Sequence, residues 1–512
     1  MPTNSAISVA RPPSFAGTMM PAVVAACACA GLLIVSDGQP LKVGLIAWAF
    51  LLAAACLPVT LYFRGLTERL LLFGLVLTLP VSLKVHLLFR EGHMGGAIGL
   101  RVSITEILMG CVLVACIWRM MNSAARTRIA VDPTIRKALA VYLACAAIST
   151  LLGSDGELGL YQLAAIVQAF LVFVFVTNYV TSAQRLRICI VGAVLSLAVQ
   201  SAIAIVQVEK PGLVNLSSLG AEEQSEETVV AGSVALPNVD KGTTTIAGEI
   251  EHRPSGLLIH PNVLAAYLVL SIPLAFAGWV VASSFWMQSL CLLSAGAGLA
   301  ALYFSLSRSG WAGLGLALLL MAWLWRRLPL QKATAAKKLV IAVAVVGALV
   351  GIAWQSQKIY LRLTESASDA VNFRSELAAT AWNMTKAHPF FGVGYNSFTE
   401  NMDDYDEGGM SRIKKFPAHN VYLLELGEGG ILTGAAFVVL VGALLVRLFK
   451  VSTGSQDPVL GTIAVFTACG VCGFWLTQVS DYVYRIPILT TLVWFHAGLV
   501  FATANLRERP TA

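Results

Sequence analysis

The sequence predicts an all-α, polytopic transmembrane helical bundle, and two observations carry that prediction. Of 512 residues, 57% are hydrophobic and only 12% are charged, which is too few charged residues to cover one soluble globule. The apolar residues also form continuous runs, such as 70–79 and 314–325, rather than the alternating pattern of a transmembrane barrel. Soluble enzymes, DNA-binding proteins and secreted modules are therefore excluded.

The apolar runs are long enough for about 12 to 14 spanning helices, since each needs ~20 residues. In order, the candidate spans cover residues 18–36, 43–63, 70–89, 102–121, 137–152, 160–181, 186–207, 262–282, 284–306, 309–326, 338–354, 420–446, 458–478 and 486–504. Two polar stretches divide the chain into N-terminal spans (1–207), an acidic loop (208–255), central spans (256–354), a large loop (355–418) and C-terminal spans (419–512).

The charges of the short connections predict the orientation of the bundle. When the spans alternate from a cytoplasmic N-terminus, one side of the membrane holds 19 Lys and Arg residues against four Asp and Glu residues. Short basic loops stay in the cytoplasm, so we expect both termini to be cytoplasmic and both long loops to face outward. None of the ten cysteines lies in a long loop, and no disulfide framework is expected.

The large loop is the more structured of the two long loops. Residues 361–388 have helical periodicity, Pro389 ends that helix, and Gly392 and Gly394 turn the chain. The acidic loop reads as irregular or partly strand-like. The sequence contains no P-loop motif for nucleotide phosphates, so ATP-driven transport by this chain alone is not expected.

A cluster of polar residues lies where the acidic loop meets the next span. Arg253-Pro254-Ser255-Gly256 is followed by His260-Pro261-Asn262. A guanidinium on proline-restricted backbone suits a phosphate group, because its planar fork gives two charge-assisted hydrogen bonds. The alternative is an ordinary interfacial anchor. We expect Arg253 to bind an anion, with His260 and Asn262 in support.

Three further cations are candidates for the same anion. Arg308 lies in Ser305-Leu306-Ser307-Arg308-Ser309-Gly310, whose small polar residues also suit a tight turn between two spans. Arg374 belongs to the helix of the large loop. Lys84 falls inside the candidate span 70–89, where a lysine calls for a polar partner or an anionic head group, or else snorkels to the interface.

His419-Asn420 opens the next apolar helix, directly after the large loop. An imidazole at a helix start on the membrane surface titrates near neutral pH and can accept a proton, although a lone histidine is more often a structural hydrogen bonder. Glu425 and Glu428 follow one and two turns later. Because carboxylates are costly in lipid, they predict that this helix lines a polar cavity.

The large loop also contains Asp403-Asp404-Tyr405-Asp406, a D-x-D pattern that some glycosyltransferases use to hold a diphosphate through a divalent metal. An acidic loop tip beside Gly408 and Gly409 explains the same residues. We expect no metal site, which leaves the role of Asp404 and Asp406 open.

These motifs together resemble the bacterial O-antigen ligases and their O-antigen polymerase relatives. The resemblance is carried by R-x-x-G with H-P-N, by S-x-S-R-x-G, by Arg374 with Trp382 and the P-F-F-G-V-G loop, and above all by His419-Asn420 with nine residues before Gly430 and then Thr433. It covers residues 250–485, and the first 250 residues match only as a string of spans.

The resemblance implies a GT-C-like membrane glycosyltransferase with about twelve helices and a large periplasmic loop. Such an enzyme transfers O-antigen from undecaprenyl pyrophosphate to the lipid A core at the periplasmic face of the inner membrane. His419 would be the general base. Arg253, Arg308, Arg374 and Lys84 would bind the diphosphate, and His260, Asn262, Asn420 and Gly430 would support the site. No cofactor, nucleotide sugar or nucleic acid is expected. The alternatives are a polymerase that extends the lipid-linked glycan and a glycolipid transporter.

Overall fold

The computed structural model describes residues 66–81, 84–90, 92–121, 129–210, 243–246, 249–330, 332, 334, 367–412 and 415–507. Its helices are α3 (Leu66–Thr78), α4 (Ile104–Met121), α5 (Pro133–Leu152), α6 (Gly156–Tyr179), α7 (Ala183–Glu209), α8 (Pro261–Val281), α9 (Phe285–Phe304), α10 (Arg308–Arg327), α13 (Ala367–Ala387), α14 (Phe398–Asn401), α15 (Val421–Thr453), α16 (Pro458–Thr477) and α17 (Pro487–Arg507). Two antiparallel hairpins accompany them, β1 (Lys84–Phe89) with β2 (Gly99–Ser103), and β3 (Thr243–Ile246) with β4 (Glu249–His252).

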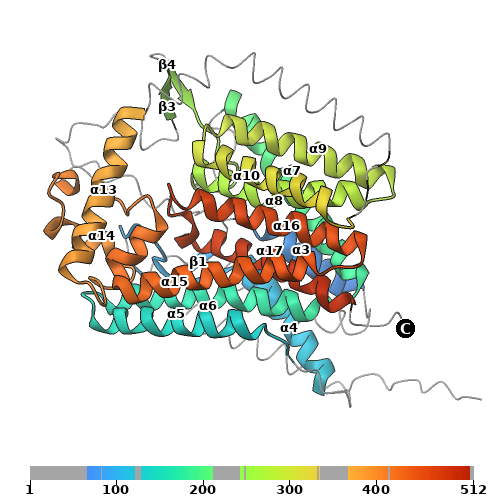
Figure 1. Cartoon of the computed structure of the whole chain (residues 1–512), viewed down its shortest axis with the longest axis horizontal. Coiled ribbons are helices and arrows are strands. Elements are labelled where there is room, and N and C mark those ends of the chain that lie inside the picture. The colour runs from blue at the N-terminus through green and yellow to red at the C-terminus, as the bar shows by residue number, and fades with distance from the viewer. Residues whose placement is uncertain are drawn as a thin grey trace, which may run out of the picture.

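Most of the long helices run along one common axis and form a bundle, whereas α13 stands across them at one end (Figure 1). Within the described residues, eight helices are long and apolar enough to cross a membrane. α8 is the central helix: it packs against α7, α9, α10 and α16, and 94% of its most apolar window is buried. The predicted all-α, polytopic helical fold is confirmed, and the chain is a multi-pass membrane protein.

Most predicted spans in the described residues coincide with a helix, but the one over 70–89 is wrong in its second half. α3 ends at Thr78, before Pro80, and the chain continues into β1. Lys84 therefore lies in a strand opposite Ser103, outside any spanning helix. The apolar residues between Val81 and Phe89 had masked a change from helical to strand structure. The candidate spans 18–36, 43–63 and 338–354 lie outside the described residues.

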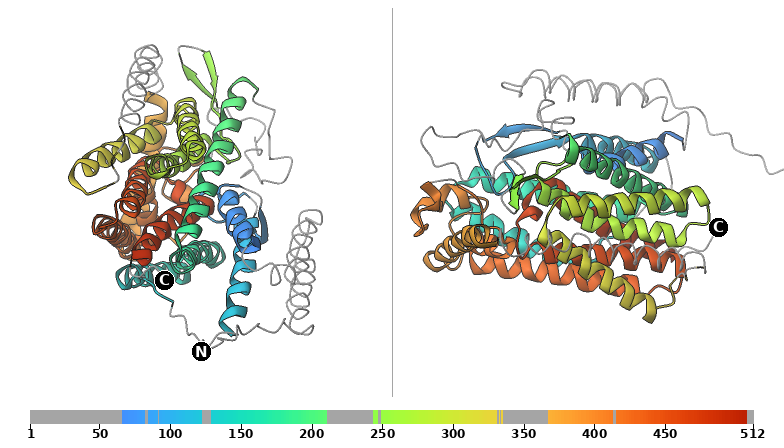
Figure 2. Two further views of the ribbon diagram at one scale, coloured as in Figure 1. Left: turned by 90° about the vertical axis from the view of Figure 1, so that its right-hand side faces the viewer. Right: turned by 90° about the horizontal axis from the view of Figure 1, so that it is seen from above.

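The two long loops follow their predicted character where they are described. α13 ends at Ala387, directly before His388-Pro389, as the proline predicts. The strand-like part of the acidic loop is the β3–β4 hairpin. These segments gather at one end of the bundle, with α13, α14 and the hairpins on the left of Figure 1, and the view from above in Figure 2 shows the same grouping. We call this the His419 end.

The opposite end carries the basic residues that the sequence assigned to one side. At this end Asp132, the N-cap residue of α5, forms an ion pair with Arg447 of α15 at 2.6 Å. The start of α5 therefore lies next to the C-terminal part of α15. Arg326 and Arg327 end α10 at the same end, as the antiparallel order of the helices requires. Arg326, Arg327 and Arg447 thus lie at the end of the bundle remote from His419.

Glu425 and Glu428 line no polar cavity, contrary to the sequence prediction. Both side chains are fully buried and form ion pairs with Arg485, at 2.9 Å to Glu425 and 2.7 Å to Glu428. The Arg485 guanidinium also lies over the ring of Tyr395, 4.6 Å from its centroid. Arg485 supplies one positive charge for the two acids, and the Glu428 carboxylate also accepts from the backbone N–H groups of Asn396 (3.0 Å) and Phe398 (3.1 Å). The helix tolerates these carboxylates because their partners lie inside the protein.

We expect Arg485→Met to destabilise the protein by about 3–5 kcal/mol, because it leaves two buried carboxylates without their counter-charge. Thermal or denaturant unfolding in detergent measures the loss. Glu425→Gln and Glu428→Gln combined with Arg485→Met removes all three charges and should recover much of it. An equal loss in the single and the triple variant would contradict the ion-pair explanation.

Candidate functional site

Arg253, His260 and Asn262 are fixed at the start of α8. The Arg253 guanidinium donates through Nε to the Ser305 carbonyl (2.8 Å) and through Nη2 to Asn262 Oδ1 (2.7 Å). Asn262 donates in turn from Nδ2 to the carboxylate of Asp481 (2.8 Å). Arg253 is thus tied to the α9–α10 turn and, through Asn262, to the segment before α17. Two of the Arg253 N–H groups are therefore used to hold these segments of the site together.

His260 caps α8 and has a defined tautomer. Its Nδ1 accepts from the backbone N–H of Asn262 at 3.1 Å, so the ring proton is on Nε2. Burial, with the nearby positive charges of Arg253 and Arg374, lowers the pKa of His260 to about 3. His260 is therefore a neutral hydrogen-bond donor at physiological pH and adds no charge to the site.

His419 is brought next to this cluster by the turn that precedes α15. It lies within electrostatic range of His260, Arg374 and Asp481. The imidazole is surrounded by the rings of Phe373, Phe416 and Tyr482, with centroid distances of 5.9, 6.3 and 5.3 Å. These aromatic contacts hold the ring in one orientation.

The hydrogen bond of His419 leaves the nitrogen that a base needs. Nδ1 lies 3.1 Å from the carbonyl oxygen of Pro417, and because a carbonyl only accepts, Nδ1 carries the proton. In the neutral ring Nε2 then holds the free lone pair, and it has no hydrogen-bond partner within the described part of the chain. Burial lowers the pKa of His419 from its ordinary value; Arg374 acts in the same direction and Asp481 opposes it. The neutral, proton-accepting form is the one present near pH 7.

Arg308 and Arg374 contribute two further positive charges to the site. Arg308 is the first residue of α10, and Arg374 lies in α13. Both side chains are partly buried, and the two positive charges repel each other. Within the described residues neither guanidinium has a hydrogen bond or an ion pair to a protein group. Two sheltered, unpaired guanidinium groups beside each other indicate a place for an anion.

Asn420 has a structural function at the start of α15. Its Oδ1 accepts from the backbone N–H groups of Tyr422 and Leu423, at 2.9 and 3.1 Å, as helix N-caps do. The carbonyl of Pro417 and the aromatic rings orient His419 instead. A direct role of the Asn420 amide nitrogen toward substrate stays a prediction.

Gly430 breaks α15 where the large loop crosses it. Its φ of 68° is unfavourable for other residues, and a Cβ would lie 2.4 Å from the Phe390 carbonyl carbon. At this break Ile431 N–H donates to the Pro389 carbonyl (2.8 Å), and Gly394 N–H donates to the Glu428 carbonyl (3.0 Å). The glycine thus joins the P-F-F-G-V-G loop to the helix that carries His419.

We expect Gly430→Ala to cost about 2–5 kcal/mol of stability, from the left-handed backbone and the clash with the loop together. Thermal unfolding in detergent measures it. Gly442→Ala is the matched control on the same helix, because a Cβ there meets nothing within 4 Å and should be neutral or slightly stabilising. Similar losses in both variants would contradict this role of Gly430.

Asp481 and Arg485 were missed from the sequence. The Asp481 side chain is 3% exposed, and its carboxylate accepts a hydrogen bond from the Asn262 amide. Its negative charge acts on His419, and its backbone carbonyl accepts from Val421 N–H at 3.1 Å. The sequence does contain a signal for them, because Asp481 and Arg485 are opposite charges within the seven residues, 479–485, that separate two predicted spans. Such an interruption at the outer edge marks polar contacts inside the bundle.

Asp406 of the D-x-D pattern and its neighbour Asp403 are engaged inside their own loop. Asp406 accepts from the backbone N–H groups of Gly408 (3.1 Å) and Ser411 (2.5 Å), and Asp403 pairs with Lys415 at 2.6 Å. Asp404 is exposed. No group of three His, Cys, Asp or Glu side chains suited to a metal occurs in the described ranges.

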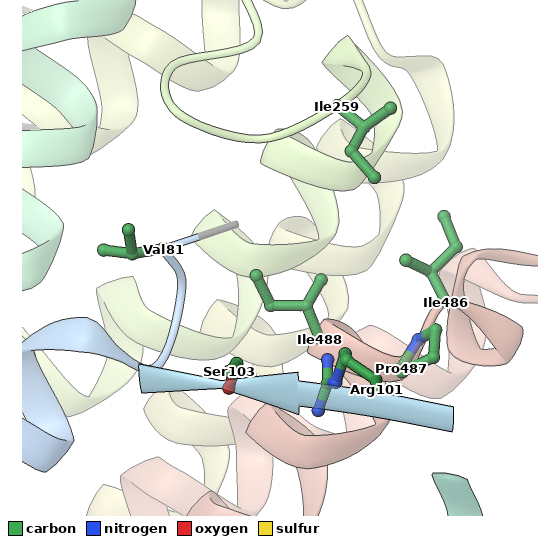
Figure 3. Close-up of a pocket in the computed structure, with 7 residues that line it drawn as sticks. All are labelled: Val81, Arg101, Ser103, Ile259, Ile486, Pro487 and Ile488. Carbon is green, nitrogen blue, oxygen red and sulfur yellow. The ribbon is translucent and has the colours of Figure 1, made fainter. Parts of the chain in front are cut away.

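β1 and β2 pass close to the loop that carries His260. Ile259 shares a small cavity with Val81, Ser103 and Ile488, as Figure 3 shows. Its volume of about 10 Å³ is at the limit for a single water and excludes a substrate. Because Lys84 pairs with Ser103, its backbone lies near this loop. A diphosphate-binding role for Lys84 stays a prediction.

The fold and the site together define a polytopic membrane protein with a cationic cluster and a neutral histidine at one end of its bundle. Residues 290–438, which are 149 of the 512, match the family model described as O-antigen ligase. This match supports membership of the O-antigen ligase/polymerase superfamily, a family of glycosyltransferase-like enzymes. The matched segment includes Arg308, Arg374 and His419, whereas Arg253 and His260 precede it. No curated protein matches the chain.

Proposed function

We propose that the protein is an O-antigen ligase, which transfers O-antigen polysaccharide from undecaprenyl pyrophosphate to a sugar hydroxyl of the lipid A core. The observation that carries the proposal is that Arg374 lies near a neutral His419 and near Arg308, and that among the described residues neither guanidinium nor His419 Nε2 has a hydrogen-bond partner. A diphosphate leaving group needs positive charge, and an attacking hydroxyl needs a base. The family match to O-antigen ligases supports the same class of reaction.

In the proposed reaction, His419 Nε2 takes the proton of the acceptor hydroxyl as that oxygen bonds to the anomeric carbon. The bond from that carbon to the diphosphate oxygen breaks at the same time, and its electron pair leaves with undecaprenyl diphosphate. Arg308 and Arg374 stabilise the charge on the leaving group, with Arg253 and Lys84 as further candidates. One displacement inverts the anomeric configuration. Asp481 stabilises the imidazolium that forms.

In this proposal the protein spans the inner membrane and the His419 site lies on its periplasmic side. Arg326, Arg327 and Arg447, at the helix ends remote from His419, support this orientation, since short basic connections stay cytoplasmic. Lipid-linked glycan and lipid A core would then meet at the outer surface of that membrane. Both termini would be cytoplasmic.

Purified protein incubated with lipid-linked glycan and lipid A core tests the function. Ligation predicts a glycan covalently joined to lipid A core. A longer lipid-linked glycan would instead identify a polymerase, and the absence of any covalent product, with glycolipid movement in proteoliposomes, would identify a transporter. Either result overturns the proposal.

We expect ligation to proceed without a divalent metal, because arginines supply the positive charge and Asp406 is engaged by backbone N–H groups. Activity measured after EDTA treatment should stay within about twofold of the untreated enzyme, since no metal contribution of several kcal/mol would be lost. Abolition by EDTA with recovery on adding Mg²⁺ or Mn²⁺ would move the diphosphate-binding role to Asp404 and Asp406.

A further inference from the structure

A cavity of about 330 Å³ lies at the end of the bundle remote from His419. It is formed by the start of α3, the end of α6 and the start of α7, and is lined by Glu68, Arg69, Leu72, Tyr179, Ser182, Gln184, Arg185 and Ile188. The length of α6 gives the distance between this cavity and the His419 site. That helix begins next to the large loop, where Ser154 N–H donates to the Val393 carbonyl (3.2 Å), and its 24 residues span about 36 Å before Tyr179. The cavity therefore lies about one membrane thickness away.

One arginine of this cavity is held rigidly. Arg185 donates through Nη1 to the Tyr179 carbonyl (2.9 Å) and to Thr181 Oγ1 (3.2 Å), and its guanidinium lies 4.2 Å from the centroid of the Tyr179 ring. Glu68 approaches the same guanidinium at 3.7 Å and accepts from the Tyr179 hydroxyl at 3.4 Å. The single carboxylate of the cavity is thus already engaged with Arg185.

The second arginine keeps its charge available. Arg69 is exposed and has no carboxylate partner in the described residues. The Gln184 amide satisfies the hydrogen-bonding needs of both its oxygen and its nitrogen in one orientation. In that orientation its oxygen accepts from Nη1 and Nε of Arg69 at 3.0 and 3.3 Å. The neutral amide therefore orients the Arg69 guanidinium and leaves its positive charge uncompensated. The cavity holds an excess of one positive charge, and a phosphate ester is the group that such a fork binds best.

The apolar parts of the cavity distinguish a lipid from free phosphate. Leu72 and Ile188 line it beside the cations. Leu66 and Leu70, one turn apart on α3 and flanking Arg69, are 61% and 58% exposed. Exposed leucines next to a cationic pocket at a helix end match a glycerol phosphate whose acyl chains continue along the helix surface.

We propose that this cavity binds the phosphate headgroup of an anionic membrane lipid, in the leaflet opposite the His419 site. The lipid would bridge α3 to the α6–α7 turn through Arg69. This proposal rests on the cavity alone and does not require the proposed glycosyltransferase reaction.

The test is binding of phosphatidylglycerol, phosphatidylcholine and inorganic phosphate to the full-length protein in detergent, followed by native mass spectrometry and thermal melting. We expect phosphatidylglycerol to bind and raise the melting temperature, with Arg69→Gln weakening its binding roughly tenfold or more. Arg187→Gln is the matched control, because Arg187 is an exposed arginine of α7 that does not line the cavity. It should bind like the wild type.

Arg69→Lys covers the case in which Arg69→Gln does not fold, because it keeps the charge and loses the fork. Its binding should be intermediate. Wild-type binding in both Arg69 variants would overturn the proposal, as would equal binding of phosphatidylcholine. Equal protection by inorganic phosphate would show a free-phosphate site and would overturn the assignment to a lipid.

Discussion

His419→Ala should lower the rate of ligation by about 10²- to 10⁴-fold, the usual contribution of a general base. The reason is geometric: Nδ1 donates to the Pro417 carbonyl, so Nε2 is the atom that can take the proton of the acceptor hydroxyl. The measurement is turnover with lipid-linked glycan and lipid A core. Membrane insertion and donor binding should be largely kept, because the diphosphate is bound by other residues.

His388→Ala is the control for this experiment. His388 is an exposed histidine of the same loop, and its Nε2 lies 2.8 Å from the Tyr405 hydroxyl, outside the cationic cluster. It should retain near-normal turnover. A His419→Ala enzyme with near-normal turnover would remove the proposed base.

The pH profile of the wild type gives an independent check on His419. Only the neutral imidazole accepts a proton, and burial lowers its pKa below the ordinary 6.5. The acidic limb of kcat/KM should therefore fall at a pH below 6.5, with full activity near pH 7.

Arg374→Ala should lower kcat/KM by about 30- to 1,000-fold, which corresponds to the ~2–4 kcal/mol of one lost charge-assisted contact to the transition state. Arg374 has no hydrogen bond or ion pair within the described residues, so its removal costs little stability. Arg374→Lys should recover activity only in part, because an ammonium lacks the bidentate fork. Arg308→Lys should behave similarly.

Arg412→Ala is the matched control, an exposed arginine of the same loop that takes no part in the cluster. It should leave kcat/KM unchanged. Full activity in Arg374→Lys and Arg253→Lys combined would reject the diphosphate-binding role of both arginines, and a fall in melting temperature parallel to the fall in activity would indicate a structural role instead.

Hydropathy predicted the helical bundle, and motif positions predicted that His260 and His419 lie at the starts of helices. Hydropathy predicts the bundle because lipid requires long apolar helices. The motifs are informative because R-x-x-G, H-P-N and His419-Asn420 lie at ends of predicted spans, and those ends meet at one end of the bundle. The β1–β2 hairpin was missed, since its apolar residues extend a helical run across Pro80.

Tertiary contacts decided the rest. Glu425 and Glu428 indicated a cavity when considered on their own helix, but Arg485, sixty residues after Glu425, forms an ion pair with each of them. Asn420 was expected to support the site, whereas its amide oxygen accepts from the backbone at the N-terminus of α15. Such partners are set by which helices pack together, and a single sequence does not record them.

The stereochemistry of the product tests the central claim most directly. With a lipid-linked donor of known anomeric configuration and purified lipid A core, the linkage formed can be assigned by NMR. A single displacement with His419 as base predicts that the anomeric configuration is inverted. A product that retains the donor configuration would contradict the account, because retention requires a double displacement and a nucleophile that the cluster of Arg253, Arg308, Arg374 and His419 does not supply.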